Sequence, residues 1–328
     1  MPATDAMVTM APRRISTMPA PKDDQHIDVP VAQRERRDGR QRSAGNDGGR
    51  LAVVDDPGQF FGLGRGVGRH ECRTGLHIGA GKDSLEIGGA DNPVVKDAFG
   101  LPYVPGSSLR GRLRSLLEQS NGLSIPSELV YLSRRKGQEV RIHQSDRPDD
   151  EICLLFGRNP GRVERVSGGE AVEGGVASPA RLTVYDAPLV AESITAQMRE
   201  NLDDELTEVK SDPAIASITS QANPRTLERV PAGAHFRFRL VLDVLCEEDR
   251  PLLARVVEGL RLLEDDTLGG GGSRGSGRVA FSGLKLTWRG KGFYASGAPE
   301  QELLASGDLA ALQALASNEG FAEKLSES

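Results

Sequence analysis

The clearest helix of the chain is predicted at residues 105–117, which read PGSSLRGRLRSLL. Four leucines recur there at helical spacing and form one apolar stripe: Leu109, Leu113, Leu116 and Leu117. Ser107 or Ser108 can cap the helix, because a serine hydroxyl accepts hydrogen bonds from the free N–H groups of a first turn. We therefore expect an amphipathic helix with one buried face.

Strands are expected on both sides of this helix. Five stretches read as strands, from short apolar runs or from alternation of apolar and polar residues: residues 74–81, 152–156, 181–185, 235–242 and 279–286. A second amphipathic helix is expected at residues 252–260. The order strand–helix–strand, repeated once, predicts an α+β fold made of two ferredoxin-like halves or of one elaborated half.

The two ends of the chain differ from the middle. Residues 1–59 carry six prolines and no apolar periodicity, so we expect a disordered arm. The folded domain is expected over residues 60–295. Residues 296–328 hold six acidic residues and one lysine, with a helix expected over residues 299–316, and read as an acidic helical tail.

The composition is that of an ordinary globular protein, with 38% hydrophobic and 27% charged residues among 328. No stretch approaches the roughly 18 uncharged apolar residues of a membrane span. The three cysteines, Cys72, Cys153 and Cys246, show no paired spacing, which argues against a disulfide framework and favours a reducing cytoplasm. The net charge of −6 does not suggest a basic nucleic-acid binder, so local basic clusters must be judged separately.

One basic cluster lies at the start of the predicted helix. Arg110 and Arg114 are four residues apart and share a helix face. A helix N-terminus offers free N–H groups and a partial positive charge, so this segment can form a phosphate cradle. A capped surface helix with solvated arginines explains the same residues, and both interpretations stay open.

A second cluster is the glycine-rich segment 268–278, which reads LGGGGSRGSGR. Consecutive backbone N–H groups can form an anion nest, and Arg274 and Arg278 add positive charge. A flexible connector is the alternative. The segment contains a G-x-G-x-x-G pattern, but it follows a helix and leads into a strand, which excludes a dinucleotide site.

The third candidate is Asp91, in the loop segment 85–97 that reads LEIGGADNPVVKD. A loop carboxylate can hold a divalent metal or orient a nucleophile, although an aspartate before Asn-Pro more often forms a turn. The histidines are scattered and suggest no catalytic set. His143 and Cys153 together are too few for zinc.

Three strings now converge on a known family. Residues 74–81 (TGLHIGAG) with 87–97 (IGGADNPVVKD), then 101–118 (LPYVPGSSLRGRLRSLLE), then 268–279 (LGGGGSRGSGRV) resemble the RAMP superfamily of CRISPR proteins. The chain looks most like the repeated backbone subunit of the type III-A (Csm) effector complex. The resemblance covers about residues 74–288, with shorter matching strings at residues 155–157, 181–187 and 227–233.

The resemblance implies an RRM-like, ferredoxin-like core with insertions, including a thumb β-hairpin expected at about residues 205–230. In the family, copies stack along one CRISPR guide RNA together with other type III effector subunits. Each thumb displaces a nucleotide, and complementary target RNA is cut beside it in a metal-dependent reaction. The loop aspartate needed for that cut corresponds to Asp91, with Mg²⁺ or another divalent ion such as Mn²⁺ as cofactor.

The resemblance also implies RNA contacts, which fall on three segments. They are the helix start, the glycine-rich loop and the thumb: Ser107, Ser108, Arg110 and Arg114; Gly270, Gly271, Ser273, Arg274, Gly275 and Arg278; Lys210, Arg225 and Arg229.

The chain departs from the family in three ways. Residues 62–69 make a poor first strand where the family has an apolar one before Thr74. Only fragments of the family's His/Cys cluster remain before residue 155, so we predict no zinc. The first sixty residues match nothing in the family.

Two other functions stay open. One is a non-catalytic structural RAMP subunit, in which Asp91 only shapes a loop. The other is a metal-independent guide-processing endonuclease, against which the lack of a convincing histidine near the glycine-rich loop counts.

Overall fold

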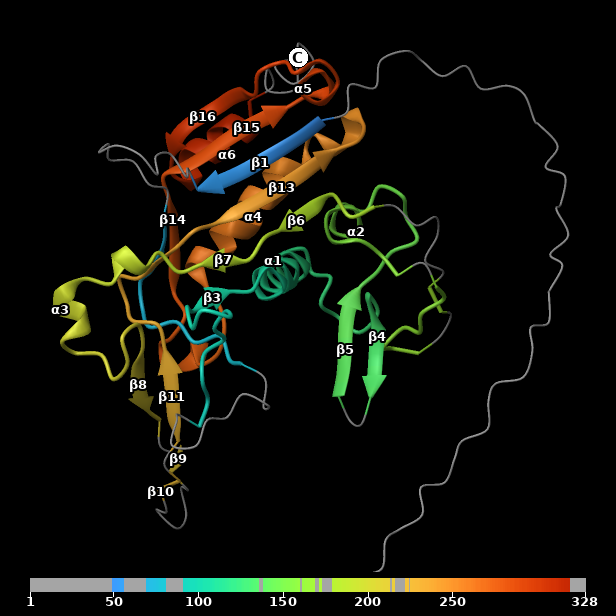
Figure 1. Cartoon of the computed structure of the whole chain (residues 1–328). Helices are drawn as coiled ribbons and strands as arrows, with labels where there is room; N and C mark the ends of the chain where they lie inside the picture. Colours follow the sequence, from blue (N-terminus) through green and yellow to red (C-terminus); the bar gives the residue numbers. More distant parts are fainter. Residues whose placement is uncertain are drawn as a thin grey trace, which may run out of the picture. The chain divides into compact units, whose positions relative to one another are not determined.

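A five-stranded antiparallel sheet organises the fold (Figure 1). The order is β16 (Gln301–Gly307), β15 (Leu284–Arg289), β1 (Gly49–Asp55), β13 (Arg239–Val244) and β6 (Leu182–Val184). The computed structural model describes residues 49–55, 69–80, 91–135, 138–159, 161–168, 171–172, 179–212, 214–215, 222–223 and 225–318. Mixed helices and strands confirm the predicted α+β class.

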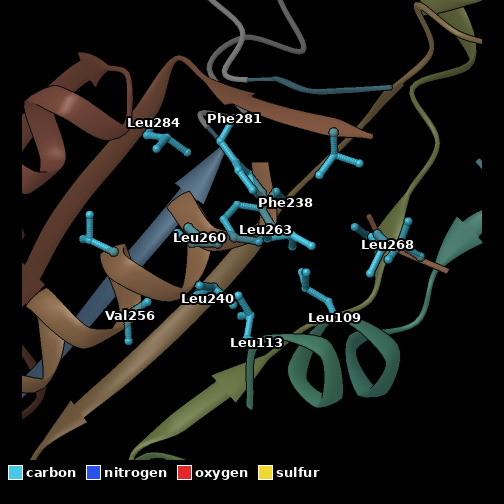
Figure 2. Close-up of a cluster of buried hydrophobic side chains, with 14 of the residues drawn as sticks. Leu109, Leu113, Phe238, Leu240, Val256, Leu260, Leu263, Leu268, Phe281 and Leu284 are labelled. Atoms are coloured by element: carbon cyan, nitrogen blue, oxygen red, sulfur yellow. The ribbon is translucent and has the colours of Figure 1, made fainter. Parts of the chain in front are cut away.

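The predicted helix forms as α1 (Gly106–Ser120), and its leucine stripe is buried. It packs against α4 (Leu252–Asp265), which in turn contacts α6 (Leu309–Ala316). Figure 2 shows side chains from α1, α4 and β13 meeting in one cluster, which Leu268 joins from the start of the glycine-rich loop. Each fully buried leucine stabilises the fold by roughly 1.5–3 kcal/mol. None of the described helices is long and apolar enough to cross a membrane.

The prediction of a disordered arm over residues 1–59 is wrong for residues 49–55. These residues form β1, which pairs with β13 on one edge and β15 on the other. The run Leu51-Ala52-Val53-Val54 is too short to stand out among polar neighbours, yet such short runs are typical of central strands. The apolar first strand therefore lies upstream of residues 62–69. Of these only Arg69, the first residue of β2, is described, and residues 1–48 and 56–61 are outside the described part.

The helix predicted over residues 299–316 is also corrected. Residues 301–307 form β16 at the edge of β15, and only Leu309–Ala316 is helical, after the short helix α5 (Lys291–Ser296). Glu302 pairs with Lys285 at 2.7 Å, so acidic residues of the expected tail face a basic residue of β15. The domain thus continues past residue 295.

Two of the expected strands differ in the structure. Residues 152–156 belong to a helix, α2 (Glu151–Phe156), because the Asp150 carboxylate accepts a hydrogen bond from the Cys153 N–H at 2.8 Å and caps it. Residues 74–80 make only isolated bridges, at Leu76 with Val230 and at Gly79 with Val94.

Two other stretches each divide between two sheets. Residues 235–242 divide between β12 (His235–Phe236) and β13, and residues 279–286 between β14 (Val279–Ser282) and β15. A second sheet has the order β12, β2 (Arg69–Cys72), β14.

Further two-stranded pairs and short helices complete the described part of the chain. They are β3 (Tyr103–Val104) with β7 (Ala187–Pro188), β4 (Leu129–Arg135) with β5 (Gln138–His143), β8 (Glu208–Ser211) with β11 (Thr226–Arg229), β9 (Ala214–Ile215) with β10 (Ala222–Asn223), α3 (Ala196–Arg199) and the 3₁₀ turns Ala191–Ser193, Glu247–Asp249 and Gly272–Arg274. A hairpin thus lies within the interval 205–230 where the thumb is expected (Figure 1).

A buried histidine in β2 makes stability depend on pH. His70 is 1% exposed among Phe236, Phe238 and Phe281, and neither ring nitrogen has a hydrogen-bond partner among the described residues. Burial, with a smaller contribution from His235, lowers the pKa of His70 to about 4. Below pH 6.5 His70 is protonated in the unfolded chain, whereas in the folded chain it stays neutral down to about pH 4. Acid therefore favours unfolding.

We expect His70→Leu to reduce this acid sensitivity. Between pH 7.5 and pH 5, wild type should lose about 2 kcal/mol more unfolding free energy than the variant. Urea unfolding of both proteins at the two pH values measures the difference. Equal losses would show that His70 is not the responsible group.

Candidate functional site

Asp91 is held against strand β11 of the β8–β11 hairpin, at the end of the ladder nearer the turn. Its carboxylate Oδ2 accepts hydrogen bonds from the Thr226 N–H and hydroxyl, each at 2.9 Å. Its own N–H donates to Thr226 Oγ1 at 2.9 Å. The side chain is exposed, and Oδ1 has no hydrogen-bond partner among the described residues. Asp91 therefore offers one free carboxylate oxygen to solvent.

The surroundings of Asp91 favour its charged form. The pKa of Asp91 is lowered first by the Thr226 backbone N–H, then by the Thr226 hydroxyl, with a smaller effect from the charge of Arg225. The carboxylate is thus ionised at neutral pH and can hold a cation. Magnesium is commonly bound by one or two carboxylates together with substrate phosphates, so one free oxygen at this position fits such an ion.

The buried carboxylate of Glu228 holds the Asp91 loop in place. Glu228 is 7% exposed. Its Oε2 accepts from the Val94 N–H at 2.8 Å, and its Oε1 accepts from the Thr207 hydroxyl at 2.7 Å and pairs with Lys96 Nζ at 2.9 Å. The Glu228 N–H donates to Asn92 O at 3.1 Å. Hydrogen bonds of Glu228 with Asn92 and Val94 therefore join the hairpin to the Asp91 loop.

Lys96 is the only cation paired with Glu228 among the described residues, and Asp204 binds it from the exposed side at 3.2 Å. Burial lowers the pKa of Lys96, but the hydrogen bonds and charges of Glu228 and Asp204 outweigh it, so the net pKa is raised. Lys96 is thus fully charged and held by the protein.

His77 links the hairpin to the glycine-rich loop. Its Nδ1 donates to Glu228 O at 2.7 Å, since a carbonyl can only accept, and its own carbonyl accepts from the Gly270 N–H at 2.8 Å. Gly269 has φ +78°, and a Cβ there would lie 2.2 Å from His77 O, so only glycine fits. His77 therefore has a structural role. The sequence could not predict this role, because its partner Glu228 is 151 positions away.

The glycine-rich loop also contacts the hairpin directly. Lys210 Nζ donates to Arg274 O at 3.2 Å, and the Arg274 guanidinium pairs with Asp212. Ser273, Gly275 and Arg278 are exposed. The structure thus brings the predicted residues of loop and hairpin together with Asp91.

The two predicted hairpin arginines differ. Arg225 is exposed, and its side chain has no hydrogen-bond partner among the described residues. Arg229 pairs with Glu208 at 2.5 Å and lies across Gly75, where a Cβ would be 2.5 Å from the Arg229 side chain. Arg229 also lines a hollow of about 420 Å³ beside α3.

At the start of α1, where a phosphate cradle is expected, the first N–H has a protein partner. The prediction of a Ser107 or Ser108 cap is wrong, because Asp186 Oδ1 accepts from the Gly106 N–H at 2.7 Å while neither serine side chain caps the helix. A carboxylate of the protein thus lies at the positive end of the helix, and the RNA contacts expected of this segment stay a prediction.

Both arginines of the expected cradle have protein partners. Arg110 donates to Phe156 O at 2.6 Å. Arg114 is 12% exposed and binds Glu118 Oε1 and His143 O, both at 2.7 Å. No hydrogen bond or ion pair connects either to the Asp91 loop in the described part of the chain. Arg112, which was missed, joins α1 to the two residues that precede the glycine-rich loop, through Thr267 O at 3.0 Å and Asp266 at 2.5 Å.

A separate polar cluster lies where α2 begins. Donor atoms of His143, Asp150 and Cys153 lie within 4.8 Å of one another, and His143 Nε2 bonds Asp150 at 3.0 Å. Burial raises the pKa of the Cys153 thiol to about 11, so it is protonated. The described residues supply three donors where structural zinc sites hold four, and the absence of zinc remains a prediction.

Comparison with known proteins finds clear relatives. The RAMP superfamily matches residues 70–280. The CRISPR system Cms endoribonuclease Csm3 of Methanocaldococcus jannaschii is 37% identical over 228 residues, covering 68% of this chain and 80% of that protein. The Csm3 endoribonuclease of Methanothermobacter thermautotrophicus is 38% identical over 233 residues, covering 71% and 89%. A crystal structure of a Csm3–Csm4 subcomplex of the type III-A CRISPR-Cas interference complex is 26% identical, with a TM-score of 0.48, covering 82% of this chain and 96% of that chain.

Proposed function

The chain belongs to the RAMP superfamily and, within it, to the family of Csm3 endoribonucleases, and we propose that it is a guide-RNA-binding backbone subunit of a type III CRISPR effector complex that cuts complementary target RNA. Its partners are guide and target RNA, further copies of itself and other subunits of the complex, in a reducing cytoplasm. The observation that carries the proposal is the ionised, exposed Asp91 carboxylate held against β11 of the β8–β11 hairpin.

The RNA surface we propose follows the cluster around Asp91. Exposed positions of the glycine-rich loop, with Lys210 beside them, present N–H groups and positive charge to a phosphate backbone. Arg225 lies next to the carboxylate and can contact the strand being cut. The RNA contacts expected at the start of α1 stay predictions outside this cluster, where Arg110 and Arg114 bind protein groups.

The proposed reaction needs little covalent chemistry from the protein. The hairpin splays the target strand, so that a ribose 2′-hydroxyl lies in line with its own phosphorus. Attack forms a bond between the 2′-oxygen and that phosphorus and breaks the bond from the phosphorus to the 5′-oxygen of the next nucleotide. The 2′-hydroxyl gives up its proton and the leaving 5′-oxygen gains one, so the products are a 2′,3′-cyclic phosphate and a 5′-hydroxyl. Asp91 would hold a divalent ion through Oδ1, and the ion would neutralise charge that develops on the phosphate. The task of the protein is to hold that carboxylate beside the distorted strand.

The experiment that tests this proposal maps cuts in complementary RNA by guide-loaded complexes, with magnesium and with chelator. We expect regularly spaced cuts that need magnesium, because the Asp91 carboxylate is itself negative and cannot neutralise the negative charge that develops on the phosphate. Cuts that persist in chelator would favour a metal-independent nuclease. Tight target binding without cuts in either condition would indicate a structural subunit.

A further inference from the structure

The contact between Asp91 and Thr226 is reciprocal. Three hydrogen bonds of 2.9 Å join the two residues, and the Thr226 hydroxyl takes part in two of them, once as donor and once as acceptor. An exposed aspartate in a loop ordinarily rotates between staggered conformers. Here two donors on Oδ2 hold the carboxylate in one orientation and leave Oδ1 facing away from them.

The neighbouring residues extend this contact along the strand. Asn92 Nδ2 donates to Thr226 O at 3.2 Å, Asn92 forms a parallel bridge with Leu227, and the Glu228 N–H donates to Asn92 O at 3.1 Å. The Asp91 loop is thus attached to β11 like a short added strand. A movement of β11 would carry the carboxylate with it.

We infer that Thr226 is a positioning residue for the cleavage reaction: its hydroxyl orients the Asp91 carboxylate and couples it to the hairpin that distorts the target strand. The inference rests on the proposed function. It assigns Thr226 no contact with RNA; its effect passes through Asp91. A partner that orients a metal-holding carboxylate commonly contributes 10–100-fold to activity or affinity.

The hydroxyl, rather than the shape of the side chain, is the feature that matters. Thr226 lies in β11 opposite Ser211 of β8, a position that suits any β-branched residue. Valine preserves that shape and the backbone N–H donor but removes the hydroxyl. Serine preserves the hydroxyl and removes only a methyl group. The two substitutions therefore separate the orienting contact from the packing of the strand.

The test compares Thr226→Val and Thr226→Ser in the full guide-loaded complex, with Ser211→Ala as the matched control. At saturating target and magnesium, we expect the valine variant to cut about tenfold more slowly or worse, and the serine variant within about threefold of wild type. Affinity for a target carrying 2′-deoxy sugars at the cut positions should be unchanged in all three. Ser211→Ala should cut like wild type, since Ser211 has no hydrogen bond to Asp91 in the described structure.

A second readout does not depend on cutting. The Asp91 amide donates to Thr226 Oγ1, so its hydrogen exchange should become faster in the valine variant and stay near the wild-type rate in the serine variant.

Three results would overturn the inference: wild-type cutting by the valine variant, equal slowing in both variants, or slowing accompanied by loss of target binding. Wild-type cutting by an Asp91→Ala complex would instead overturn the proposed function.

Discussion

Replacing Asp91 with alanine is expected to slow target cutting by about 100-fold or more, while guide loading and target binding persist. The carboxylate is exposed and makes no contact with the hydrophobic core, so its loss leaves the fold intact. What the alanine variant lacks is the ionised carboxylate beside β11, whose Oδ1 has no hydrogen-bond partner among the described residues.

Asp91→Asn separates charge from shape in the same experiment. The asparagine side chain keeps an oxygen that can accept from Thr226, but it carries no charge for a divalent ion. We expect it to cut nearly as slowly as the alanine variant. Asp97→Asn is the matched control, because Asp97 is an exposed carboxylate of the same loop whose side chain accepts, among the described residues, only from the Phe99 and Leu101 N–H groups. Single-turnover rates in magnesium measure all three, and wild-type cutting by Asp91→Asn would exclude a role for the charge.

Local sequence patterns predicted the two helices whose formation depends on the spacing of nearby residues. The leucine stripe of α1 and the second helix at α4 follow from helical spacing alone and are confirmed. Strand β1 was missed because its apolar run is only four residues long and its stability comes from ladders with β13 and β15, distant in sequence. The edge of β15 likewise makes residues 301–307 a strand where composition favours a helix.

In the candidate site, too, the residues with a local sequence signal were predicted and those with distant partners were not. The resemblance identified Asp91, and glycine content identified the loop around Arg274, since both signals lie within a few consecutive residues. Glu228 and His77 were missed, because their partners lie 134 and 151 positions away in the sequence. Spacing alone could not distinguish Arg110 and Arg114, which bind protein groups, from arginines that face a phosphate. Contacts of long sequence separation carry no local signal.

The largest expected loss of stability follows substitution of Glu228. Its two carboxylate oxygens face three donors, from Val94, Thr207 and Lys96. Glu228→Gln leaves one acceptor oxygen and turns an NH₂ group toward a donor, at a position that is only 7% exposed. Removing one partner of a buried ion pair typically costs about 3–5 kcal/mol. Since Lys96 keeps Asp204, we expect a loss of about 3 kcal/mol in the free energy of unfolding.

Asp204→Asn is the control for this substitution, because Asp204 binds the same lysine from a position where its side chain is 59% exposed. Exposed pairs contribute at most about 1 kcal/mol, so this variant should unfold close to wild type. Urea unfolding of the isolated chains measures both, and a Glu228→Gln loss below about 1 kcal/mol would show that the network relaxes around the amide. The variant should also cut more slowly in the assembled complex, because Glu228 joins the Asp91 loop to β11, and a loosened loop no longer holds the carboxylate beside the strand.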